Sequence, residues 1–222
     1  MAGEKEAERC LVVPRKELFG HDDQYAFTGF KRKEAWDVDL EEVLGRHSFY
    51  APRKTSNKED DVEYQEDLKQ IIPGVVFLYQ DKIFTYTRLS GSGEARLVGR
   101  NDLMIAGHIN PADQGNPANQ KRTYEETFWK ALHREFNEEV DFADSYSLVH
   151  VGYVNCDVTP VDKVHFGLFY IIDGRSPDIS VRETDALQGS LKSCEEIERL
   201  DPPLREWQKY LYDEFLKGYL KK

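Results

Sequence analysis

The stretch EETFWKALHREFNEEVDF, residues 125–142, decides the fold expected for this chain. Apolar residues recur in it at intervals of three and four, which places them on one stripe of a helix and predicts that the stripe is buried. They are Trp129, Leu132, Phe136 and Val140. Thr123 is a predicted N-cap, and Glu126 three residues later completes a capping-box pattern. The helix should therefore begin near Thr123 and run to about Val140.

The same helix carries a group of acidic residues, Glu135, Glu138 and Glu139, although like charges three and four positions apart repel one another. At about 100° per residue, these carboxylates fall within an arc of roughly 100° beside the apolar stripe. Hard cations such as Mg²⁺ prefer carboxylate oxygens and would remove the repulsion. Spacing alone favours a solvated face over a metal site by about two to one, so both interpretations stay open on this evidence.

Runs of β-branched and aromatic residues on both sides of this helix predict strands. They lie at residues 71–79, 82–89, 147–156 and 163–173, and the last is apolar on both faces, as a central strand would be. Near the end of the chain, Leu204, Trp207, Leu211 and Phe215 have helical spacing. The order of elements predicts one domain over residues 1–222 with a mixed sheet between helices, an N-terminal extension (about 1–70) and a C-terminal helix (about 203–221).

Composition excludes several classes of protein. Of 222 residues, 40% are hydrophobic, which is enough for a packed core. The 41 acidic residues outnumber the 30 basic ones and give a net charge of −11, which disfavours non-specific binding to nucleic acid or to anionic lipid. No apolar run reaches the length of a membrane helix, and the N-terminus is charged where a signal peptide is apolar. The cysteines, Cys10, Cys156 and Cys194, have no metal or redox spacing. We therefore expect a cytoplasmic protein with reduced thiols.

The stretch that includes the acidic residues resembles the box of the Nudix hydrolases. Glu126, seven intervening residues, Arg134-Glu135, Phe136, Asn137, Glu138-Glu139, Val140 and Phe142 all match its pattern. Weaker likenesses over most of residues 10–215 resemble a MutT-like branch of predicted phosphoesterases. The resemblance implies an α+β fold, an α/β/α sandwich, and hydrolysis of a diphosphate bond in a small nucleotide-type substrate.

Two positions depart from the box. Asp141 replaces the glycine that follows Glu-Glu, so we expect a strained, left-handed residue at the end of the helix. Gln120 stands where the leading glycine belongs. Gly107 is the better counterpart, and the 18 residues between it and Glu126 indicate an insertion at residues 110–121.

The resemblance also implies roles for individual residues. Glu135, Glu138 and Glu139 would bind Mg²⁺ or Mn²⁺, and either of the last two would polarise the attacking water. Arg134 would hold the glutamates through an ion pair, Glu126 would be structural, and Gly107 would let the backbone approach the phosphates.

Further candidates depend on weaker signals. Glu183 could supply another carboxylate as general base, or it could be an ordinary loop residue. Arg88, Arg96 and His165 could face a phosphate, although Arg and His on strands are more often satisfied surface or core residues. His108, which follows Gly107, could bind substrate or belong to the loop scaffold.

Two other functions share this fold. A non-catalytic module that senses nucleotides or binds protein is the main alternative, because Asp141 and the long loop lie where the geometry of catalysis matters. An isomerase of isopentenyl diphosphate is disfavoured, since Cys156 has no evident partner. Because homodimers are the commonest oligomers, we expect a homodimer.

Overall fold

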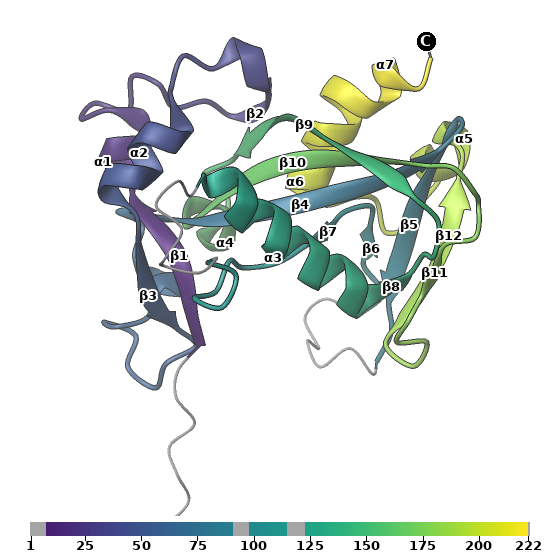
Figure 1. Cartoon of the computed structure of the whole chain (residues 1–222), viewed down its shortest axis with the longest axis horizontal. Coiled ribbons are helices and arrows are strands. Elements are labelled where there is room, and N and C mark those ends of the chain that lie inside the picture. Colours follow the sequence, from purple (N-terminus) through teal and green to yellow (C-terminus); the bar gives the residue numbers. More distant parts are fainter. Residues whose placement is uncertain (1–7, 91–97, 115–122, 222) are drawn as a thin grey trace, which may run out of the picture.

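The computed structural model describes residues 8–90, 98–114 and 123–221 (Figure 1). Its strands are β1 (Glu8–Pro14), β2 (Gly29–Arg32), β3 (Phe49–Arg53), β4 (Leu68–Tyr79), β5 (Lys82–Arg88), β6 (Asn101–Asp102), β7 (Ile105–Ala106), β8 (Val140–Asp141), β9 (Tyr146–Asn155), β10 (His165–Gly174), β11 (Ser180–Val181) and β12 (Leu187–Lys192). Its helices are α1 (Arg15–Phe19), η1 (Lys33–Ala35), α2 (Leu40–His47), η2 (Val62–Tyr64), α3 (Tyr124–Glu139), α4 (Pro160–Lys163), α5 (Cys194–Glu198), α6 (Glu206–Leu211), the π-helical η4 (Tyr212–Leu216) and α7 (Lys217–Tyr219).

A mixed sheet forms the centre of the described structure. Its main path runs β12-β5-β4-β10-β9-β2, with β1, β6 and β7 paired alongside. β10 runs parallel to β4, and the other pairs are antiparallel. Strands from the first 70 residues join this sheet, because β1 pairs with β4 and β2 pairs with β9.

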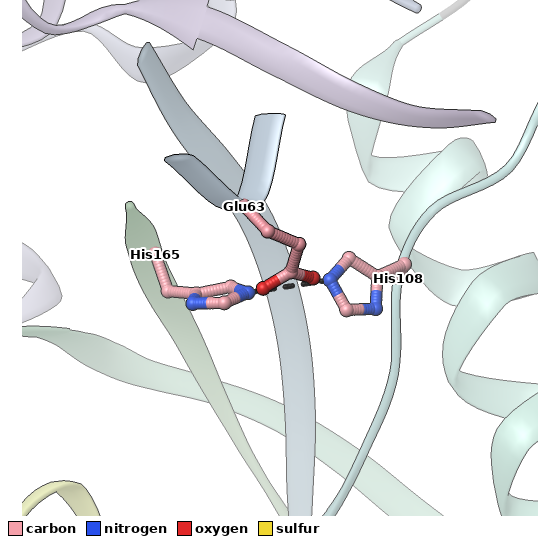
Figure 2. Close-up of side chains that lie close together, drawn as sticks. All are labelled: Glu63, His108 and His165. Atoms are coloured by element: carbon pink, nitrogen blue, oxygen red, sulfur yellow. Dashed lines mark hydrogen bonds between the residues drawn. The ribbon is translucent and has the colours of Figure 1, made fainter. Parts of the chain in front are cut away.

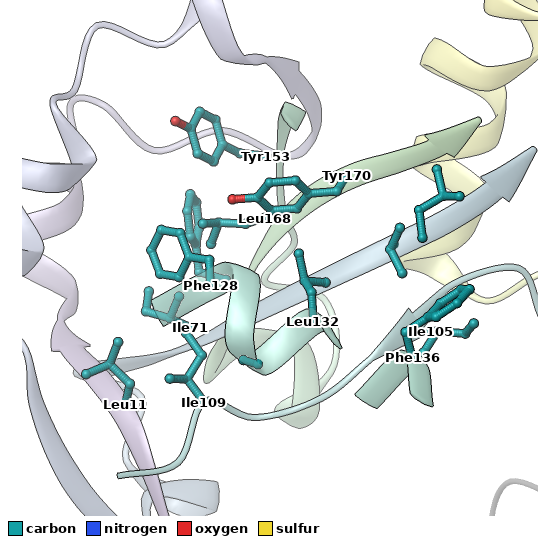
Figure 3. Close-up of a cluster of buried hydrophobic side chains, with 14 of the residues drawn as sticks. Leu11, Ile71, Ile105, Ile109, Phe128, Leu132, Phe136, Tyr153, Leu168 and Tyr170 are labelled. Atoms are coloured by element: carbon teal, nitrogen blue, oxygen red, sulfur yellow. The ribbon is translucent and has the colours of Figure 1, made fainter. Parts of the chain in front are cut away.

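The central strands are buried on both faces because helices cover each side of the sheet. Along β10, Phe166 and Leu168 face a core shared with α1, α2 and α3, whereas Phe169 and Ile171 face a core shared with α5, α6 and η4. Figure 3 shows part of the first core, in which Phe128, Leu132 and Phe136 of α3 lie over the sheet. The predicted mixed sheet between helices and the α/β/α sandwich are thereby confirmed.

The longer predicted elements also form, with shifted ends. β4 begins three residues before the predicted strand, and β10 covers residues 165–174. The C-terminal apolar pattern is helical from Trp207 onward, with the π-helical η4 within it, whereas Leu204 precedes α6; Leu211 and Phe215 are buried. In the described part of the chain, the three cysteines are free thiols and no helix has the length and hydropathy needed to span a membrane.

Candidate active site

The start of α3, the helix with the acidic residues, is capped by another helix. Glu41 of α2 accepts hydrogen bonds from the backbone N–H groups of Tyr124 (2.9 Å) and Glu125 (3.0 Å). The side chain of Thr123 makes no capping bond, so the predicted capping box with Glu126 is wrong, and Glu126 is exposed. A carboxylate from α2 can replace the local cap because it satisfies the free N–H groups and complements the helix dipole.

The buried face of α3 differs from the predicted stripe at one end. Its buried apolar residues are Phe128, Ala131, Leu132, Phe136 and Val140. Trp129 is 51% exposed, so its predicted place in the core is wrong. It packs instead against His133, with ring centroids 3.6 Å apart and the ring planes tilted by 45°. Phe128 takes the inward position because it lies one turn from Leu132 on the same side of the helix.

The rotation of α3 buries two of the three glutamates and leaves the third at the surface. At about 100° per residue, Glu139 lies about 20° from Leu132 and Glu135 about 60° from it, whereas Glu138 lies about 120° away. Accordingly, the side chains of Glu135 and Glu139 are 17% and 20% exposed, and that of Glu138 is 60% exposed. Two carboxylates are therefore held inside the fold, with a third at the rim.

Arg134 connects the acidic helix to the loop after β7. Its guanidinium contacts Glu135 Oε1 at 2.6 Å and Glu138 Oε2 at 3.6 Å. It also donates to both carboxylate oxygens of Asp113, at 3.0 and 2.8 Å, and to the carbonyl of His108 at 2.9 Å. The ion pair with the glutamates agrees with the predicted supporting role, and Asp113 fixes the orientation of the guanidinium.

Gly107 makes room for the Glu135 carboxylate. A Cβ atom at Gly107 would lie 1.9 Å from Glu135 Oε1 and 2.0 Å from Cδ, far inside van der Waals contact. The backbone of Gly107 does not have the positive φ that favours glycine, so the close approach alone requires it here. The glycine identified in the sequence thus contacts the acidic helix directly.

Glu139 has the most unusual environment of the three acids. Its Oε2 is buried and has no hydrogen-bond partner, and its Oε1 lies 4.0 Å from Nη2 of Arg88. Burial raises the pKa of Glu139 to about 7; the charge of Arg88 opposes this effect, and the charge of Glu135 adds to it. A buried oxygen without a partner is costly, and a bound cation would satisfy it.

Asp141 does not strain the end of the helix. Val140, the C-cap residue, has extended φ and ψ angles of −133° and 153°, and Asp141 follows it in β8, paired with Ser180. The non-glycine residues with positive φ in the described ranges are Asp23, Lys54 and Gln80. The expected left-handed residue is therefore wrong. The chain leaves α3 as a strand, where glycine has no advantage.

The predicted substrate-binding residues fall in two places. Arg88 lies beside Glu139, whereas His108 and His165 lie together, with Nε2 atoms 3.3 Å apart (Figure 2). Burial lowers the pKa of both histidines, so both rings are neutral at pH 7. They line a cavity of about 200 Å³ together with residues from α4 and α6.

Of two further candidates, the structure describes Glu183 but not Arg96. Arg96 and most of the inserted loop lie outside the described residues. Glu183 is exposed and follows Arg182, whose backbone N–H donates to the carbonyl of Glu139 at 2.9 Å. The loop with Glu183 is therefore attached to the end of the acidic helix.

Sequence patterns did not reveal several residues that position the site. Asp102 is 1% exposed and bonds Arg88, and Asp113 is 4% exposed and bonds Arg134. Each lies more than ten residues from its partner, so no local spacing signalled the pair. Asn110 and Asp113 form an Asx-type turn, which the residues NPAD could have indicated.

Carboxylates are the ligands that a hard divalent cation prefers, but Glu135, Glu138 and Glu139 do not form a group whose ligand atoms all lie within 4.8 Å of one another. Glu135 and Glu139 supply partly buried carboxylates, one of whose oxygens is unpaired, and Glu138 stands at the rim. A tighter grouping occurs elsewhere in the described ranges, where ligand atoms of Glu63, His108 and His165 lie within 4.8 Å of one another.

Comparisons with known proteins agree with this geometry. No protein-family model matches the chain. The curated protein YmaB of Bacillus subtilis (strain 168) is 26% identical over 212 residues, which cover 93% of this chain and 96% of YmaB. The crystal structure of Tm1382, "a putative Nudix hydrolase", superposes with a TM-score of 0.67 and 30% identity, over 95% of this chain and 100% of Tm1382. On this likeness over the whole of Tm1382, the chain belongs to the Nudix hydrolase superfamily.

Proposed function

We propose that this hydrolase cleaves a phosphoanhydride bond in a small nucleotide-type diphosphate, by attack of water assisted by Mg²⁺ or Mn²⁺. The observation that carries the proposal is the environment of Glu139, a buried carboxylate with an unpaired oxygen between Glu135 and Arg88. Stability alone would not select an acid at this position, because a neutral side chain would avoid the desolvation cost.

Glu135 and Glu139 would hold the cation, with Glu138 as a third ligand at the rim. Arg134 orients Glu135 and is itself held by Asp113. These contacts keep the carboxylate in place before the cation binds, which is the usual function of hydrogen bonds behind metal ligands. The described part of the chain thus contains both the proposed ligands and the residues that would support them.

When bound, the cation would neutralise phosphate charge and lower the pKa of water. The oxygen of water then attacks phosphorus, the anhydride P–O bond breaks, and a carboxylate accepts the proton. The exposed Glu138 and Glu183 are the candidates for this acceptor, because each can reach solvent. Arg88, 4.0 Å from Glu139, is our candidate for stabilising the developing negative charge, and Arg96 is a further candidate for phosphate binding.

The test is a screen of nucleoside diphosphates linked to other groups, with Mg²⁺ or Mn²⁺ and with product analysis by chromatography. Glu139→Gln should lower the rate by at least about 100-fold, because it removes a metal ligand. Without metal this variant should melt no lower than the wild type, because an amide replaces a buried carboxylate whose Oε2 has no hydrogen-bond partner. Glu125→Gln, on the exposed face of the same helix, is the matched control and should keep its rate.

Failure of every substrate in the screen, with unchanged metal binding in Glu139→Gln, would refute the proposal. Nucleotide binding without metal and without product would instead favour the sensing module. Asp141 no longer motivates that alternative, because it lies in an ordinary strand pair. The expected homodimer and cytoplasmic location remain proposals, to be checked by light scattering and by cell fractionation.

A further inference from the structure

We propose that Glu63, His108 and His165 form a second metal site, for a divalent transition ion of the zinc class, with an open coordination position facing a cavity. We call these residues the histidine cluster. They come from η2, the loop after β7 and the start of β10, and Figure 2 shows their side chains converging. Their ligand atoms all lie within 4.8 Å of one another.

The separation of the imidazoles suits two ligands of one ion. Their Nε2 atoms are 3.3 Å apart. Two ligands of a tetrahedral ion with bonds of about 2.05 Å lie about 3.3 Å apart. A hydrogen bond from an N–H group is usually shorter, about 2.7–3.2 Å. The histidines thus already have the spacing that a zinc-class ion requires.

His165 is held in the orientation of a ligand. Its Nδ1–H donates to the carbonyl of Val161 in α4 at 2.6 Å. A carbonyl can only accept, so the proton of the neutral ring is on Nδ1 and the lone pair of Nε2 points toward His108. A backbone bond behind the ligating ring is the usual way in which proteins fix a metal-binding histidine.

Glu63 keeps one oxygen for an ion. Arg53 donates from Nε and Nη2 to Oε1 of Glu63, at 3.0 and 2.8 Å, and from Nη1 to Glu8 at 2.8 Å. Glu8 also lies 4.0 Å from Nζ of Lys54, so the two carboxylates and the two cations of this group balance in charge. A carboxylate oxygen of Glu63 completes a donor set of two imidazoles and one carboxylate, a combination that binds zinc with a fourth position open.

The open coordination position of the proposed ion would face a cavity. His108 and His165 line the cavity of about 200 Å³, together with Asp162, Arg205 and Trp207. The indole Nε1 of Trp207 is buried and has no hydrogen-bond partner. Trp207, which lines the cavity, therefore has an N–H group available to donate to an oxygen atom. Water, or an oxygen of a small ligand, would fit between the ion and this donor.

The histidine cluster is separate from the acidic helix. None of its three residues belongs to α3: Gly107 lies against Glu135, whereas His108, the next residue in the loop after β7, lies in the histidine cluster. The acidic helix offers oxygen ligands for a hard cation, and the histidine cluster offers nitrogen ligands for a softer one. The two sites should therefore bind different ions independently.

The test is calorimetry of chelator-stripped protein with Zn²⁺ alone, with Co²⁺ as the spectroscopic probe. We expect one tight zinc site per chain, visible absorption bands typical of tetrahedral Co²⁺, and no displacement of Zn²⁺ by Mg²⁺. His108→Gln and His165→Gln should each weaken binding by at least about 100-fold. His21→Gln, at an exposed histidine, and Glu139→Gln, in the acidic helix, should leave zinc binding unchanged.

Circular dichroism without metal checks that each variant folds. Because His108 is only half-buried, its substitution should leave the fold intact even if that of His165 does not. Diffraction from wild-type crystals at the zinc absorption edge is independent of any variant and should give a peak among the three side chains. Tight zinc binding that survives His108→Gln, or crystals grown with zinc that lack this peak, would overturn the proposal, whether or not the enzyme hydrolyses a diphosphate.

Discussion

Gly107→Ala should separate activity from stability at the proposed metal site. The added Cβ would lie 1.9 Å from Glu135 Oε1, whereas ordinary contact begins near 3.4 Å, so the carboxylate must move by about 1.5 Å (3.4 minus 1.9). The displaced atom is the end of a flexible side chain, and the backbone of Gly107 accepts alanine, so unfolding should become easier by only about 1 kcal/mol. A shift of about 1 Å in a positioned group can cost about 100-fold in rate, so we expect a loss of at least that size.

The assay compares kcat/KM and the Mg²⁺ concentration for half-maximal rate, together with urea unfolding without metal. Gly45→Ala is the matched control, because nothing lies within 4 Å of a Cβ at that position. It lies inside α2, where alanine should stabilise the helix by about 0.5–1 kcal/mol and leave kcat/KM unchanged.

A second variant tests the cause of the loss. Glu135→Asp shortens the side chain by one carbon–carbon bond, about 1.5 Å, which matches the required displacement. Combined with Gly107→Ala, it should therefore cost less activity than the sum of the two single losses. Wild-type activity and metal affinity in Gly107→Ala would show that the position of Glu135 is irrelevant to catalysis and would refute this reasoning.

Three further predictions concern charge. Binding of Mg²⁺ should weaken by about tenfold per pH unit below pH 7, where the proton on Glu139 competes with the cation, and should level off above it. A metal titration at several pH values checks this, and Glu139→Gln should remove the inflection near pH 7. Asp141→Gly should change kcat/KM by less than about threefold, because Asp141 makes an exposed ion pair with Arg182, and such pairs contribute little; a large gain in rate would mean that the box glycine matters here after all. Asp157→Asn should destabilise the fold by about 3 kcal/mol, because it removes the carboxylate 2.8 Å from the fully buried Lys69; urea unfolding measures this, and a change below about 1 kcal/mol would contradict it.

Apolar residues that recur every two residues in a strand, or every three to four in a helix, were sufficient to predict the longer strands and the acidic helix. The alternation of apolar residues in 163–173 predicted a strand buried on both faces, and β10 has both of its faces in a core. The spacing of Leu132 and Phe136 predicted the inner side of α3. Both signals arise within a few residues, where the geometry of a helix or strand alone determines which side chains share a face.

The failed predictions involve choices between local and distant partners. Thr123 is the N-cap residue of α3 as predicted, but the carboxylate of Glu41 in α2 supplies the capping bonds. Trp129 has the spacing of a core residue, but it lies at the edge of the stripe, and the sheet packs against Phe128. Asp141 could end the helix in a left-handed turn, but pairing with β11 holds the chain extended. In each case a contact between distant segments competed with a local one of similar strength.

By itself, the sequence determined which side chains α3 presents together and therefore that three carboxylates occur on one side of a helix. Only the tertiary structure decided which of them are buried, that Gly107 admits Glu135, and that Glu139 keeps an unpaired oxygen. Only the tertiary structure also places Glu63 next to His108 and His165. The physical reason is that burial and pairing depend on which surfaces meet when distant segments pack, and residue spacing records only neighbours along the chain.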